Sequence, residues 1–225
     1  MGIISLEKSD HLFWLGRYAE RVFTTLDSFF RYFDRMLDMD DAEVAYQSFC
    51  KELSIPNSYK DQEDFIHKYL FSQNDPNSVY SNMLRAFDNA VVLRDELSSK
   101  TLSYIQLALD SIERAEDSQA LVYDLQPVLD DLFAFWGCLD DNVEDEECRN
   151  IIKCGKYLER LDLYMRLGYP YRSIEKEYNK FLNRLHKIRI GYNLSEVDKL
   201  SEIINLGDDW RSRYQEALLA LCNIF

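Results

Sequence analysis

Charged residues recur at helical spacing in two segments whose starting glycines, Gly16 and Gly155, are 139 positions apart. Each segment has a basic residue, an acidic residue three positions on and an arginine directly after it: Arg17, Glu20 and Arg21 in the first, Lys156, Glu159 and Arg160 in the second. Residues three or four apart share a helix face, so opposite charges can pair there. Arginines that face one another can instead bind a carboxylate or phosphate. Structural ion pairing and an anion-binding site, with Arg94 as a further candidate, both remain open.

The glycine that opens each segment supports a repeat. A glycine inside a helix costs about 1 kcal/mol relative to alanine, so two at matching places indicate close helix approach. The apolar flanks also match: Leu12 with Ile151, Val22 with Leu161, and Leu26 with Met165. We expect an internal pseudo-two-fold repeat whose two helices pack together. The alternative is that charges merely decorate two unrelated amphipathic helices.

An acidic run offers a second chemistry. Asp140, Asp141 and Glu144 resemble the DDxxD/E box of helical isoprenoid synthases, in which carboxylates one helical turn apart hold Mg²⁺ against a diphosphate. No second motif of this kind follows, and a solvated helix end is the simpler interpretation.

Other catalytic and metal patterns are missing from the sequence. The three histidines form no Glu-x-x-His pair, and the five cysteines form no CxxC pair. There is no glycine-rich phosphate loop and no G-x-S-x-G motif. We therefore expect no metal and no cofactor, and the sequence leaves open whether the protein is an enzyme.

Charge and hydropathy exclude some partners. The net charge is −14 and the sequence pI is about 4.7, which disfavours nucleic acid and anionic membrane surfaces. No apolar run approaches the ~20 residues that span a bilayer. The N-terminus has no basic region followed by a long apolar stretch. We expect a cytoplasmic protein.

The elements that must position these residues are helical throughout. Apolar residues recur every three or four positions, while Gly and Pro are scarce. We predict an all-α fold, a single compact bundle over residues 1–225 with about seven to nine helices. One long helix is expected over about 8–38. Another is expected over about 77–116, opened by Asp75 and Pro76 and with a bend near Ser98-Ser99. Pro127 is expected to open a later helix.

Four motifs in order resemble the alpha-E domain family. They are Phe13–Arg21 (FWLGRYAER), Asp75–Val79 with Asp88–Ser98, Phe135–Gly137, and Gly155–Arg160 (GKYLER). The similarity covers about residues 1–167, and residues 168–225 are expected to be a diverged or shortened end. Three positions depart from the family pattern: Phe87 and Val91 each replace an arginine, and Lys100 replaces an acidic residue.

The resemblance implies a bacterial helical domain without an established activity, encoded beside or fused to circularly permuted ATP-grasp ligases and transglutaminase-like proteases. It implies an accessory or interaction module of a peptide or amide-bond synthesis or modification system, with such a ligase or protease as partner. The alternative is an enzyme with its own pocket, acting on peptides or, through Asp140, Asp141 and Glu144, on diphosphates. A solid core favours the module. An open cavity lined by Arg17, Arg21, Arg94 and Arg160 favours the enzyme.

Overall fold

A computed structural model describes residues 4–36 and 42–225, and this part of the chain contains helices and no strand. The α-helices are α1 (Leu6–Met36), α2 (Ala42–Leu53), α3 (Gln62–Phe71), α4 (Val79–Val92), α5 (Ser99–Ala115), α6 (Leu121–Asn142), α7 (Glu146–Arg166), α8 (Tyr171–Leu185), α9 (Leu194–Ile204) and α10 (Tyr214–Cys222), with a 3₁₀ helix η1 (Gly207–Arg213) before α10. The predicted all-α fold is confirmed. No helix in the described ranges has the length and apolar character needed to cross a membrane.

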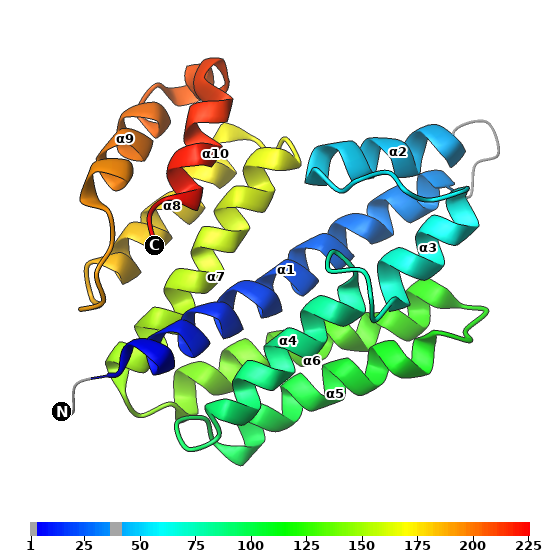
Figure 1. The fold of residues 1–225 in the computed structure, drawn as a ribbon, viewed down its shortest axis with the longest axis horizontal. Helices are drawn as coiled ribbons and strands as arrows, with labels where there is room; N and C mark the ends of the chain where they lie inside the picture. Colours follow the sequence, from blue (N-terminus) through cyan, green and yellow to red (C-terminus); the bar gives the residue numbers. More distant parts are fainter. Residues whose placement is uncertain (1–3, 37–41) are drawn as a thin grey trace.

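The long helix α1 runs through the middle of the molecule (Figure 1). Helices α4, α5 and α6 lie along one side of it, and α2 and α3 cover its C-terminal end. Helix α7 packs against α1 more extensively than any other element does, and α8, α9 and α10 form the far end of the molecule beyond α7. The two helices that carry the repeat are therefore direct neighbours.

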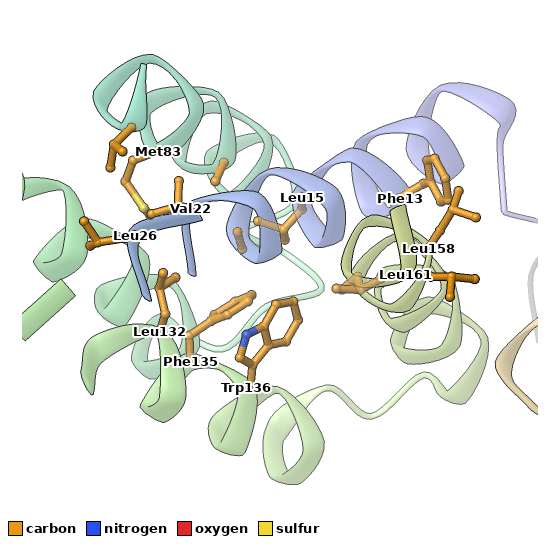
Figure 2. Close-up of a cluster of buried hydrophobic side chains, with 14 of the residues drawn as sticks. Phe13, Leu15, Val22, Leu26, Met83, Leu132, Phe135, Trp136, Leu158 and Leu161 are labelled. Atoms are coloured by element: carbon orange, nitrogen blue, oxygen red, sulfur yellow. The ribbon is translucent and has the colours of Figure 1, made fainter. Parts of the chain in front are cut away.

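The apolar stripe of α1 holds these helices together (Figure 2). Val22 and Leu26 are fully buried and point toward Met83 of α4 and Leu132 of α6. Farther toward the N-terminus, Phe13 lies beside α7. Each buried side chain of this size stabilises the fold by roughly 1.5–3 kcal/mol, so the three- and four-residue spacing read from the sequence is what assembles the core.

Helices α1 and α7 touch backbone to backbone at the two repeat glycines. A Cβ atom added to Gly16 would lie 2.0 Å from the carbonyl oxygen of Ile152. One added to Gly155 would lie 2.1 Å from the carbonyl oxygen of Phe13. Adding 139 to the residue numbers Gly16 and Phe13 gives Gly155 and Ile152, so each contact is the counterpart of the other and the crossing is pseudo-two-fold. The expectation that the two repeats face one another is confirmed.

The predicted helix over about 77–116 is divided into α4 and α5, with the break next to the predicted bend at Ser98-Ser99, so ten α-helices are described rather than seven to nine. The chain turns after α4, where the amides of Glu96 and Leu97 both bond to the carbonyl oxygen of Leu93. Ser98 then caps α5, because its hydroxyl accepts a hydrogen bond of 3.1 Å from the amide of Thr101.

Two predicted helix starts are wrong. Ser78, not Asp75, caps α4 by accepting from the amide of Ser81 at 2.9 Å. The Asp75 carboxylate instead accepts from the amide of Asn77 and stabilises the preceding turn. Pro127 lies inside α6, which begins six residues earlier at Leu121. The proline leaves one carbonyl of the preceding turn without its helical partner, and the flanking helix tolerates that loss.

Candidate functional site

The Glu159 carboxylate of α7 is held by two arginines of α1. The Nε atom of Arg17 donates to Oε2 at 2.7 Å, and that of Arg21 donates to Oε1 at 2.5 Å. Glu159 is fully buried. Burial alone would raise the pKa of Glu159, but the two guanidinium groups hold it below its ordinary value. A buried carboxylate in this setting stays charged.

The mirror-related contact joins Glu20 of α1 to Arg160 of α7. Arg160 donates from Nε at 2.6 Å and from Nη2 at 2.8 Å, which is a bidentate arrangement. The hydroxyl of Thr24 donates to the same carboxylate at 2.6 Å. Glu20 is fully buried as well. The repeat motif therefore forms two reciprocal ion pairs across the glycine crossing, and its charges are drawn together rather than left on separate surfaces.

The symmetry breaks at Lys156, the counterpart of Arg17. Within the described part of the chain its ammonium group makes no ion pair and lies 3.8 Å from the centre of the Trp136 ring. Burial lowers the pKa of Lys156 to about 7, although the charge of Glu20 acts in the opposite direction. Only one of the two glutamates is therefore shared by two basic side chains.

The other candidates from the sequence lie outside this cluster. Arg94 is exposed in the turn after α4, and the structure does not bring it near the repeat residues. Asp140 and Asp141 are at the end of α6, where Asp140 pairs with Lys153, and Glu144 lies in the connection to α7. Among the described residues no three His, Cys, Asp or Glu side chains are grouped as metal ligands.

A polar cavity of about 250 Å³ opens beside the ion pairs, between α1, α3, the end of α2 and the C-terminal half of α7. Its lining residues are Arg21, Thr25, Leu53, Ser54, Ile55, Tyr69, Asn77, Asp162, Leu163 and Arg166. Arg21 thus belongs both to the ion pairs and to the cavity wall. Its Nε atom is occupied by Glu159, and no hydrogen bond of its terminal nitrogens occurs in the described residues.

A second charged pair on α7 forms the opposite wall. The Nε atom of Arg166 donates to Oδ2 of Asp162 at 2.9 Å, and its Nη1 donates to the hydroxyl of Ser54 at 2.9 Å. Asp162 is 7% exposed, and its other oxygen, Oδ1, is buried without a hydrogen-bond partner in the described structure. Burial, followed by the charge of Glu159, raises the pKa of Asp162.

Ser54 is held in an unusual backbone conformation at this wall. Its φ of 57° makes it the one non-glycine residue with positive φ in the described chain. This conformation ends α2 in a Schellman cap, in which the amide of Ile55 bonds to the carbonyl oxygen of Cys50 at 2.8 Å. The cap fixes the Ser54 hydroxyl at the cavity wall, where it accepts from Arg166.

Sequence reasoning missed most of this cavity. Asp162 and Arg166 are one helical turn apart and directly follow the second repeat, a spacing that could have marked them as a pair. Ser54, Tyr69 and Asn77 carry no comparable signal, because they reach the cavity through the packing of three separate segments.

Comparison with known proteins agrees with the motifs and the helical fold. Residues 8–200 match the family model Alpha-E, described as "a predicted alpha-helical domain with a conserved ER motif". The match runs past residue 167, where the similarity read from the motifs stops, and takes in α8 and part of α9. No curated protein and no solved structure matches the chain. The chain, whose two facing Glu-Arg pairs bind one another across a helix crossing, belongs to the Alpha-E family.

Proposed function

We propose that this protein is an accessory binding module that holds a small carboxylate ligand in the cavity between Arg21 and Arg166. The observation that carries the proposal is a local excess of positive charge. Three arginines, Arg17, Arg21 and Arg166, surround two carboxylates at this end of the α1–α7 crossing. These five side chains carry one more positive than negative charge, in a protein whose net charge is −14; a further carboxylate, that of Asp75, accepts from the amide of Asn77 beside the cavity.

Guanidinium groups at a partly enclosed wall suit a carboxylate. Arg21 presents terminal nitrogens that are free of other bonds in the described structure, on a side chain that is 35% exposed. The cavity volume of about 250 Å³ is below the roughly 300–1,000 Å³ of pockets for drug-sized ligands. The ligand is therefore small, or it is the end of a larger molecule.

The lining favours binding over covalent catalysis. No Cys or His is among the described residues that line the cavity, so the wall has no thiol nucleophile and no imidazole base to activate the hydroxyls of Thr25 and Ser54. The hydroxyl of Tyr69 is buried, and burial raises its pKa, which makes it a hydrogen-bond donor rather than a base. Of the four arginines whose shared cavity would favour an enzyme, only Arg21 lines this one in the described structure, so the enzyme alternative has less support than the module.

The wider role we propose is service to a bacterial peptide or amide-bond system, with an ATP-grasp-type ligase or a transglutaminase-like protease as partner. This part of the proposal is supported by the motif resemblance, since a carboxylate is what an amide-forming enzyme activates. Co-purification with a candidate ligase or protease tests it.

The binding proposal is tested with propionate as probe, by NMR titration at constant ionic strength. Arg166→Gln removes one guanidinium while keeping a hydrogen-bond donor, and should weaken binding by about tenfold or more, the effect of losing a charged hydrogen bond. Arg94→Gln is the matched control, because Arg94 is exposed and does not line the cavity. Equal affinities in the two variants would refute the carboxylate site.

A further inference from the structure

The buried oxygen of Asp162 gives the cavity a second chemical requirement. Oδ2 of this carboxylate is bonded to Arg166, while Oδ1 has no partner among the described residues. A buried acceptor without a hydrogen bond costs on the order of 1–3 kcal/mol, and more when it is charged. Native proteins rarely keep such an atom unless water or a ligand satisfies it.

The position of Asp162 relative to the arginines defines what would satisfy it. The residue lines the same cavity as Arg21 and Arg166. The terminal torsion of aspartate is broad, so a turn of the carboxylate would bring Oδ1 to the cavity and would release Arg166 from its bond to Oδ2. A ligand group that donates a hydrogen bond can then bind Oδ1, and a cationic donor would bind it most strongly. The arginines remain available to an anionic group of the same ligand.

We propose that the cavity binds a free α-amino acid as its zwitterion, with the ligand ammonium group at Asp162 and the ligand carboxylate at Arg21. This inference rests on the proposed carboxylate site and adds the ammonium subsite to it. One carbon atom separates the two charged groups of an α-amino acid, which suits a small cavity with opposite charges on its walls. The same lining includes the hydroxyl of Thr25, which donates to the carbonyl oxygen of Arg21 at 2.7 Å, and the side-chain amide of Asn77, which donates to Asp75 at 3.3 Å.

A matched probe series separates the two subsites. L-alanine has both charged groups, propionate lacks the ammonium group, and L-alaninamide lacks the carboxylate. The wild-type protein should bind L-alanine at least about tenfold more tightly than either of the other two, as measured by NMR titration. Asp162→Asn, which keeps the shape and removes the charge, should bind L-alanine no better than propionate.

The outcomes distinguish this inference from the function on which it rests. Propionate binding that equals L-alanine binding in the wild-type protein would overturn the ammonium subsite and leave the carboxylate site standing. L-alaninamide binding that equals L-alanine binding, with no propionate binding, would overturn the carboxylate site. If none of the three binds, both proposals fail. Circular dichroism melts of Asp162→Asn, with Asp162→Glu as a charge-retaining second variant, verify that a loss of binding is not a loss of folding.

Discussion

Glu20 and Arg160 form a bidentate ion pair that joins the two copies of the repeat, with hydrogen bonds of 2.6 and 2.8 Å. Its mirror image, Glu159 with Arg21, lies on the other side of the glycine crossing. Both carboxylates are fully buried. The pairing makes the charges of the motif part of the interior, and it brings Arg21 to the edge of the cavity.

Loss of one buried partner should therefore be costly. Glu20→Ala leaves Arg160 without its main counter-charge and should lower the free energy of unfolding by roughly 3–5 kcal/mol. Denaturant melts measure the change. Asp27→Ala is the control, because its pair with Arg31 is exposed and should be worth under about 1 kcal/mol. Similar losses in the two variants would show that the buried pair has no special role.

The glycine crossing makes a separate prediction. Gly16→Ala would place a methyl group 2.0 Å from a backbone oxygen of α7, so the helices must separate, at a cost of about 1–3 kcal/mol or more. Gly137→Ala is the matched control in α6, where nothing lies within 4 Å of the added atom. It should gain roughly 0.5–1 kcal/mol from the better helix former. Thermal melts in which both variants shift in the same direction would contradict the close crossing.

Lys156 should make stability depend on pH. Its native pKa of about 7 is below the ordinary value of 10.5, so between these values the unfolded state binds more protons. Stability then rises with pH across this window, by at most about 1.4 kcal/mol per pH unit. Lys156→Met removes this pH dependence. The free energy of unfolding of the variant should exceed that of the wild type most at or below pH 7, and the difference should shrink as pH rises. A difference that is constant with pH would mean that Lys156 is well solvated.

Asp162 should make stability change with pH in the opposite direction. Its native pKa is raised above 3.8, so its protonated form stabilises the folded state at low pH, and this contribution is lost as pH rises through the native pKa. Asp162→Asn should accordingly gain stability relative to the wild type above that window. Asp117→Asn, at an exposed position, serves as control in the same urea melts. A charged group kept at a stability cost is what a binding site requires.

The helices and the ion pairs were accessible to sequence reasoning for a physical reason. Helical periodicity and the match of Gly16 to Gly155 are patterns that can be seen in the sequence. Because the two segments are related by an approximate two-fold axis, the same patterns predict that the two helices pack together. The sequence did not reveal that Lys156 leaves the pairing for the Trp136 ring, because that depends on where α6 packs. Arg94 is an arginine like those of the cluster, but it lies in the turn after α4, and no local sequence pattern predicts the position of that turn relative to the ion pairs.

The cavity was beyond local reasoning. Its wall combines the helix cap at Ser54 with Tyr69 of α3 and Asp162 of α7. These residues are brought together only when α2, α3 and α7 close around the same part of α1. Nothing in the spacing of serines or tyrosines along a helix distinguishes a cavity wall from a core position.

The most direct test of the binding site is the backbone amide NMR spectrum of the wild-type protein titrated with L-alanine. We predict that the largest shifts fall on Thr25, Ser54, Asn77 and Leu163, which surround the cavity on four different segments, and that Arg94→Gln leaves this pattern unchanged. Shifts confined to other surfaces, such as the open hollow beside Trp14 and Arg85, or no saturable shifts at all, would contradict a ligand site between Arg21, Asp162 and Arg166.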